Sequence, residues 1–148
     1  MKLLWVFLTS GFLMGGWAQH RGCGCAALQA KMRCDYYVVK KGDRSKRAFC
    51  ADYANRADLD GAAGRAAWYW LLAGEPDKAL ASVRTAIKAH HMYAAEYGAF
   101  ASMMKGNQKE GVRYWRLFIH SVRSHRYAHQ DRTIVEKLYP AVDFSNLK

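Results

Sequence analysis

The side chains with the most potential for chemistry are four cysteines, Cys23, Cys25, Cys34 and Cys50, all in the first third of the chain. In exported proteins, an even number of cysteines indicates disulfide bonds. Because a ring between Cys23 and Cys25 would be very tight, we expect these two to pair with Cys34 and Cys50, in either order. The alternative is a soft-metal site made by the Cys-Gly-Cys segment, Cys34 and His20, although no zinc-type spacing is present.

No arrangement of residues typical of an enzyme active site occurs in the sequence. Serine-hydrolase, zinc-protease, phosphate-loop and haem-attachment motifs are all missing. The acidic residues Asp58 and Asp60 fall in a predicted loop, and carboxylates at such places favour helix starts. His125 and His129 are four residues apart, as two metal ligands on a helix would be, but a third ligand does not accompany them. We therefore expect a binding protein rather than an enzyme, with no catalytic residues, metal or cofactor.

Residues 1–18 have the pattern of a secretory signal peptide. Lys2 supplies the positive charge, an apolar run extends from Leu3 to about Trp17, and Ala18 is the small residue before the cut. The run is interrupted by glycine and serine and is short for a membrane span; an uncleaved anchor is the alternative. We expect an exported protein, located in the periplasm or outside the cell.

The chain is strongly basic, with a net charge of +11 over 148 residues. Such a charge attracts anionic partners but does not indicate a fold. The basic residues are most concentrated near the end of the last long predicted helix, where they follow a helical spacing of 3, 4 and 3: Arg113, Arg116, His120 and Arg123. This stripe could meet an acidic protein surface, an anionic polymer or lipid headgroups, or be a solvated helix face. We do not expect nucleic acid as a partner of an exported protein.

The sequence past the signal predicts an all-α protein. Its two prolines, Pro76 and Pro140, both lie at breaks between periodic segments. Two cysteine-containing cap helices, at about 26–40 and 45–56, are expected within residues 19–60. Two helical hairpins are expected within residues 61–124, and a closing helix at 130–140 with a short tail within residues 125–148.

The first hairpin joins helices at 62–73 and 77–90. Gly74 should end the first of these in a left-handed cap, and Pro76 should open the second, where its missing N–H is harmless. Gly106 follows Gly74 by 32 residues and begins a similar break in residues 95–119. An internal period of this length is typical of helical solenoids.

The first hairpin resembles a tetratricopeptide repeat. The residues that carry the resemblance are small, aromatic or bulky at that family's positions: Ala67, Trp70, Ala79, Val83 and Ala86. The second copy departs from the pattern, with Trp115 and Phe118 on its second helix. Sel1-like repeats are a related alternative, and an unrelated bundle of antiparallel helices would use the same apolar stripe. The resemblance implies a short α-solenoid with disulfide-linked N-terminal cap helices.

In a tetratricopeptide-like array, the first helix of each hairpin lines the concave groove. This implies a binding surface that combines aromatic contact area with a positive charge: Arg65, Trp68, Tyr93, Tyr97 and Phe100. The groove could instead be filled by the flanking helices. We expect an exported interaction module that acts as an adaptor or accessory subunit in a cell-envelope complex. The alternatives are a basic protein that binds an anionic polymer or lipid, and a protein that handles metal through its cysteines.

Overall fold

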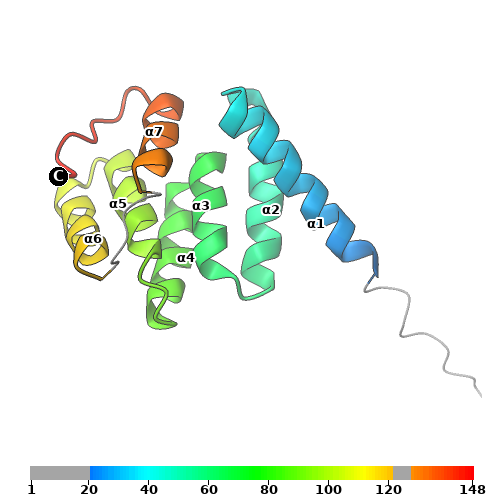
Figure 1. The fold of residues 1–148 in the computed structure, drawn as a ribbon, viewed down its shortest axis with the longest axis horizontal. Helices are drawn as coiled ribbons and strands as arrows, with labels where there is room; N and C mark the ends of the chain where they lie inside the picture. Colours follow the sequence, from blue (N-terminus) through cyan, green and yellow to red (C-terminus); the bar gives the residue numbers. More distant parts are fainter. Residues whose placement is uncertain (1–20, 122–127) are drawn as a thin grey trace, which may run out of the picture.

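Seven α-helices follow one another along the part of the chain that the structure describes, and this part contains no strand (Figure 1). The computed structural model describes the backbone of residues 21–121 and 128–148, and their side chains apart from those of residues 21–23, 128 and 129. The predicted signal peptide, residues 1–18, lies outside these ranges. The helices are α1 (Arg21–Cys34), α2 (Ala48–Leu59), α3 (Ala63–Ala73), α4 (Pro76–Lys88), α5 (Ala94–Met104), α6 (Gln108–Ser121) and α7 (Ala128–Leu138). The prediction of an all-α protein is confirmed for the described residues.

The turn between α3 and α4 has the same backbone geometry as the turn between α5 and α6, 32 residues later. Gly74 and Gly106 both adopt the left-handed conformation, with φ of 80° and 74°. In each turn the glycine N–H donates to the carbonyl three residues earlier, and the next N–H donates to the carbonyl five residues earlier. These bonds satisfy carbonyls that the end of a helix leaves free. Pro76 opens α4, as predicted.

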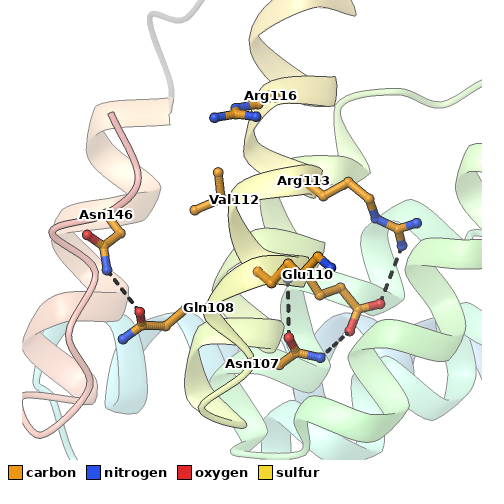
Figure 2. A pocket seen from close by; sticks show the side chains of 8 residues that line it. Asn107, Gln108, Glu110, Val112, Arg113, Arg116 and Asn146 are labelled. Carbon is orange, nitrogen blue, oxygen red and sulfur yellow. Dashed lines mark hydrogen bonds and ion pairs between the residues drawn. The ribbon is translucent and has the colours of Figure 1, made fainter.

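At the start of α6 the chain supplies its own cap. The side-chain carbonyl of Asn107 accepts a hydrogen bond from the backbone N–H of Glu110, at 3.2 Å, and its amide donates to the Glu110 carboxylate, at 3.1 Å (Figure 2). The first of these bonds satisfies a backbone N–H that the first helical turn leaves unpaired, and the second holds the Asn107 amide in place for it. One residue further on, Gly111 lets α6 approach α5 closely, because a Cβ there would lie 2.6 Å from the Met103 sulfur.

The helices pack mainly against their neighbours in sequence, and α3 also contacts α5. As a result α3 and α5 form one layer of the two hairpins, and α4 and α6 form the other. We call the side of the molecule made by α3 and α5 the inner face, and the side made by α4 and α6 the outer face. The last helix, α7, packs on α3 and α5 and therefore lies against the inner face. Among the described helices, none is long and apolar enough to cross a membrane.

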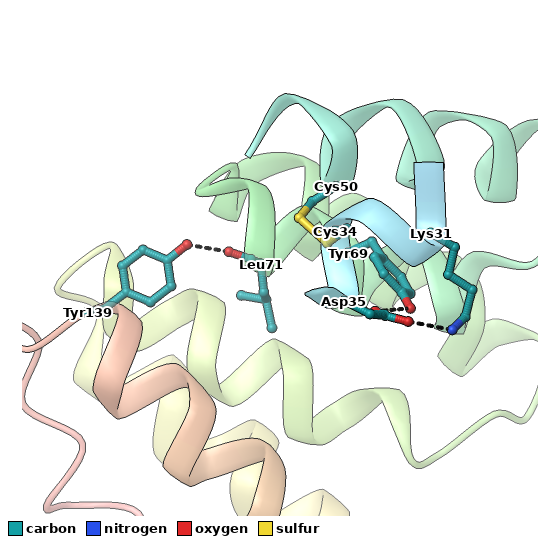
Figure 3. The surroundings of a disulfide bond; sticks show 7 residues. All are labelled: Lys31, Cys34, Asp35, Cys50, Tyr69, Leu71 and Tyr139. Carbon is teal, nitrogen blue, oxygen red and sulfur yellow. Dashed lines mark hydrogen bonds and ion pairs between the residues drawn. A yellow bond between two sulfur atoms is a disulfide. The ribbon is translucent and has the colours of Figure 1, made fainter. Parts of the chain in front are cut away.

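The N-terminal part is stabilised by a disulfide between α1 and α2 and by a partly exposed aspartate that bonds to α3. A π-helical segment, Asp35–Lys40, continues α1. Cys34 and Cys50, both fully buried, form a disulfide that joins α1 to α2 (Figure 3). The Asp35 carboxylate next to it accepts hydrogen bonds from the Tyr69 hydroxyl of α3, at 2.8 Å, and from Lys31, at 2.6 Å. The run at residues 36–39, which resembles a strand in sequence, is therefore part of a helix.

The pairing of the cysteines differs from the expected one. Cys34 and Cys50 bond to each other because α1 and α2 lie side by side, with these two Cα atoms 4.9 Å apart. The expectation that they pair with Cys23 and Cys25 is therefore wrong. Cys25 is exposed and has no disulfide partner, and the side chain of Cys23 lies outside the described part. A metal site that includes Cys34 is also excluded, because a disulfide sulfur is not a thiolate ligand.

Candidate functional site

The inner face holds most of the aromatic residues that the sequence indicates for binding, and they stack on one another. Trp68 of α3 lies 5.4 Å from Tyr97 of α5 between ring centroids, and Tyr93 lies 6.3 Å from Tyr97. The Tyr97 hydroxyl donates a hydrogen bond of 3.4 Å to Asp131 of α7. The hydroxyl of Tyr97 therefore points to α7 rather than to an open groove.

The C-terminal residues close the same face further along. The Tyr139 hydroxyl, just after α7, donates to the backbone carbonyl of Leu71 in α3 (Figure 3). The Arg132 guanidinium of α7 donates to the backbone carbonyls of Leu147, at 2.6 Å, and Phe144, at 3.0 Å. These bonds fold the tail back over α7 and α5.

Phe100 is part of the core that this closure creates. It is fully buried, and its ring packs on Phe144 of the tail, at 5.9 Å, and on Trp115 of α6, at 6.3 Å. The expectation that Phe100 lines an open groove is therefore wrong. The reason is that a segment more than forty positions later in the sequence covers it.

Two acidic residues come together where α7 meets α5. Glu96 is only 4% exposed, and its Oε1 atom has no hydrogen-bond partner among the described residues. Burial, and secondly the negative charge of Asp131, raise the pKa of Glu96 to about 8. Burial also raises the pKa of Asp131 to about 6, although the hydrogen bond from Tyr97 opposes this shift. At neutral pH the Glu96 carboxyl is therefore mainly protonated, which lowers the cost of burying it.

The remaining inner-face residues stay accessible. Arg65 is exposed and donates a hydrogen bond of 3.3 Å to the Tyr53 hydroxyl, which raises the pKa of Arg65. Tyr93 is 43% exposed and lies over Gly64 of α3, where a Cβ would collide with its hydroxyl. The open part of the inner face is thus a small region beside Trp68, which is half-buried.

The outer face has a groove between α4 and α6. Its volume is about 400 Å³, and its lining combines three apolar side chains with three cations: Arg84, Ile87 and Lys88 from α4, and Arg113, Tyr114 and Leu117 from α6. Gly98 of α5 lies beneath it, since a Cβ there would meet both Tyr114 and Val83, at 2.9 and 3.0 Å. The absence of a side chain at Gly98 thus lets α4 and α6 settle deeply over α5.

The cations of the groove are differently engaged. Arg113 forms an ion pair of 3.5 Å with Glu110 and its guanidinium lies 5.3 Å from the Tyr114 ring centroid. Arg84 and Lys88 are exposed, and no ion-pair partner for either occurs among the described residues. Their charges are therefore available to an anionic ligand.

The predicted basic stripe is present along α6 in the described part. Arg113, Arg116 and His120 are all exposed, and the His120 Nδ1–H donates to the Arg116 carbonyl at 2.7 Å. Arg123, the fourth predicted member, lies outside the described residues. A stripe of this kind adds positive charge beside the α4–α6 groove, but it has no apolar contact surface of its own.

A second, larger depression of about 1050 Å³ lies between α6 and the tail (Figure 2). Its lining is mostly polar, and its groups bond to one another: Asn146 donates to Gln108 at 3.2 Å, and Asn107 to Glu110. Arg113 also lines it, and its guanidinium pairs with Glu110 (Figure 2). Because it is wide and several of its polar groups already bond to one another, we regard it as a weaker candidate than the α4–α6 groove.

Comparisons with known proteins do not assign a family. The chain matches no protein-family model, no curated protein and no solved structure. Among the described residues, no three histidine, cysteine, aspartate or glutamate side chains come together as metal ligands do; His125 and the side chain of His129 lie outside that part. The site must therefore be judged on its own geometry.

Sequence reasoning missed several residues that matter here: Arg84, Lys88, the acidic pair Glu96 and Asp131, and the groove residues Ile87, Tyr114 and Leu117. For the first two a signal existed, because their spacing of four places them on one face of α4, opposite the buried Ala79 and Val83. For the acidic pair no local signal existed, since the two residues are 35 positions apart and meet only through the docking of α7.

Proposed function

We propose that this protein is an exported, tetratricopeptide-like interaction module whose outer face holds an acidic amphipathic segment of another protein. The observation that carries the proposal is the α4–α6 groove, in which Arg84, Lys88 and Arg113 surround an apolar floor. As an adaptor or accessory subunit in the cell envelope, it would position this partner by binding and perform no chemistry.

The hairpin geometry supports the tetratricopeptide-like part of the proposal. The left-handed turns at Gly74 and Gly106 repeat after 32 residues with the same hydrogen bonds, about two residues short of the 34-residue tetratricopeptide period. Small residues stand at equivalent places in the second helices: Ala79 is fully buried, and Gly111 permits close approach to α5. Contact between α3 and α5 is the packing that stacked helical hairpins require.

The composition of the groove favours a protein segment over a plain anionic polymer. Ile87 and Leu117 present apolar surface in the groove. A partner with apolar side chains gains binding free energy by burying this surface, whereas a polyanion without apolar groups does not. The three cations around this floor complement carboxylates on the polar face of such a partner. Charges of this kind chiefly increase the association rate and exclude basic partners, whereas the buried apolar contact supplies most of the affinity.

Binding of a synthetic amphipathic helical peptide made of leucine and glutamate tests the proposal. We expect the exported chain to bind it saturably, and the variant Arg84→Glu/Lys88→Glu to lose about tenfold or more in affinity. Leu117→Ser should also weaken binding. The control is Lys109→Glu/Lys137→Glu, which changes the charge equally at exposed positions outside the groove and should bind almost normally.

The same proteins distinguish the polymer alternative. Dextran sulfate, a polyanion without apolar groups, should bind weakly, and its binding should fall similarly in both charge-reversed variants and disappear with added salt. If the peptide behaves like dextran sulfate, so that Leu117→Ser has no effect and the control loses as much as the groove variant, the proposal is wrong.

A further inference from the structure

The outer side of α1 carries an uncovered apolar stripe. Leu28, Met32 and Tyr36 are 56%, 61% and 47% exposed, and they follow one another at intervals of four residues. On the opposite side of the same helix, Ala30, Cys34 and Val38 are buried against the body of the protein. The stripe is therefore a continuous face of one helix, which a protein in water has reason to cover.

The π-helical continuation of α1 extends this face. The Lys41 N–H donates to the Tyr36 carbonyl, five residues earlier, at 3.1 Å, and this wider turn is what distinguishes a π-helix from an α-helix. Tyr37 adds to the apolar surface, since it is 36% exposed and stacks on Phe49 of α2. Two tyrosines with polar hydroxyl tips thus stand at the end of the apolar stripe.

Cations surround the tyrosine end of the stripe. The Nζ atoms of Lys40 and Lys41 lie 5.7 and 5.6 Å from the ring centroid of Tyr36. The Arg33 guanidinium lies 5.2 Å from the Phe49 ring. The nearby acid, Asp35, is partly exposed, but its charge is balanced by Lys31, and Lys31 and Tyr69 bond to its two oxygens. The outward charge of this face is therefore positive.

We propose that the outer face of α1, comprising Leu28, Met32, Tyr36, Tyr37, Arg33, Lys40 and Lys41, docks onto an anionic lipid surface. Apolar side chains at the centre of a helix face, with tyrosines and long cationic side chains at its edge, are what a helix lying in a membrane interface requires. Each cation near an anionic leaflet adds to the attraction toward the membrane.

Other occupants fit the same face less well. In a symmetric dimer through α1, Lys40, Lys41 and Arg33 would face the same cations of the second copy, and like charges across an interface are unfavourable. A polyanion would leave Leu28 and Met32 in water. A single exposed helix also provides no groove to enclose a peptide, unlike the outer face between α4 and α6.

Docking through α1 is compatible with partner binding but does not depend on it. The helix α1 lies at one end of the molecule and α6 at the opposite end (Figure 1). A protein attached through α1 would therefore keep the α4–α6 groove free. The lipid proposal and the proposed function rest on different residues and can fail separately.

Co-sedimentation with lipid vesicles tests this inference. The probes are vesicles of phosphatidylcholine with phosphatidylglycerol, and vesicles of phosphatidylcholine alone. We expect the exported chain to sediment with the first and weakly or not at all with the second. Leu28→Glu/Met32→Glu and Lys40→Glu/Lys41→Glu should each reduce the partition coefficient by about tenfold or more. The matched control, Lys109→Glu/Lys137→Glu, should sediment like the unchanged chain.

All variants are compared in the same processed form, verified by intact mass, so that residues 1–18 contribute equally. Thermal unfolding should be unchanged, because every substituted side chain is exposed. The inference is overturned if the chain does not bind anionic vesicles, or if binding survives both α1 variants. It is equally overturned if the control loses as much as they do, or if light scattering shows a dimer that Leu28→Glu/Met32→Glu converts to a monomer.

Discussion

The inner and outer faces of the two hairpins differ in what covers them. On the inner face, α7 and the tail bury Phe100 and most of Tyr97, and they enclose the carboxyl of Glu96. On the outer face, the groove between α4 and α6 stays open, with Ile87 and Leu117 accessible. The aromatic-rich face is thus largely interior, and the face with fewer aromatic residues holds the more open groove, which is the proposed binding site.

This difference shows that an aromatic residue type does not by itself make a side chain accessible to a partner. Tyrosine, tryptophan and phenylalanine are enriched at interfaces, but the same side chains build cores. Whether Phe100 belongs to one or the other depends on Phe144, which reaches it through the folding of the tail. Substitutions on the inner face should therefore affect mainly stability, and those on the outer face mainly binding.

The largest effect is expected from Phe100→Ala. Removing a fully buried ring leaves a cavity between α5, α6 and the tail, and should lower the free energy of unfolding by about 3 to 5 kcal/mol. Leu117→Ala, in the partly exposed floor of the outer groove, should cost less than about 1 kcal/mol. Urea denaturation followed by circular dichroism measures both; equal costs would show that the two faces are not differently covered.

Glu96→Gln should alter how stability depends on pH. The folded protein raises the pKa of Glu96 from 4.5 to about 8, so it binds the proton more tightly than the unfolded chain does. Proton binding by Glu96 therefore stabilises the folded protein. This contribution to the free energy of unfolding is fully present below about pH 4.5 and is lost as the pH rises through about 8. Because glutamine cannot ionise, the stability of Glu96→Gln should fall less than that of the unchanged protein as the pH rises.

Thermal denaturation between pH 5 and pH 9 is the measurement, with Glu110→Gln as the control at a more accessible position. The stability of Glu96→Gln should still fall as the pH rises through about 6, because the pKa of Asp131 is also raised. Parallel pH profiles for the unchanged protein and Glu96→Gln would mean that water reaches this carboxyl and that α7 does not seal the inner face.

Tyr139→Phe should have a moderate effect. It removes the hydroxyl that donates to the Leu71 carbonyl and leaves that buried acceptor without this bond. The free energy of unfolding should fall by about 1 kcal/mol, and amide hydrogen exchange in α7 should increase more than in α4. Exchange that rises equally in both helices would contradict a specific role in holding α7.

The smallest effect on stability is expected from Arg84→Glu/Lys88→Glu on the outer face. Both side chains are exposed and have no ion-pair partner in the described part of the chain, so the free energy of unfolding should change by about 0.5 kcal/mol or less. Peptide binding should nevertheless be lost. A large drop in stability would show that these cations hold the fold together, and the comparison of the two faces would fail.

Local features of the fold could be predicted from the sequence. Periodicity and composition located the helices to within a few residues, and the glycine and proline at the α3–α4 turn adopt the expected roles. The first helix starts earlier than predicted, at Arg21 instead of about Ala26, because Gly22 and Gly24 weaken a helical pattern without preventing a helix.

Contacts between distant segments could not be predicted. A covalent bond between the helices that carry Cys34 and Cys50 was sterically reasonable from the sequence, but that these two cysteines pair with each other depends on how α1 lies beside α2. The covering of Phe100 depends on where the tail runs. The outer groove could be predicted only if it were known that α4 and α6 both pack over Gly98 of the intervening helix α5. In each case the residue types can be read from the sequence, but which of them come into contact is decided by how the helices and the tail pack.

The most direct test of the account is an NMR titration of residues 19–148 with the leucine–glutamate peptide. We predict that the largest chemical-shift changes occur at the methyl groups of Ile87 and Leu117, while the indole N–H of Trp68 is unchanged. Shifts concentrated at Trp68 and Tyr93, with Ile87 and Leu117 unaffected, would show that partners bind the inner face and would contradict the central claim.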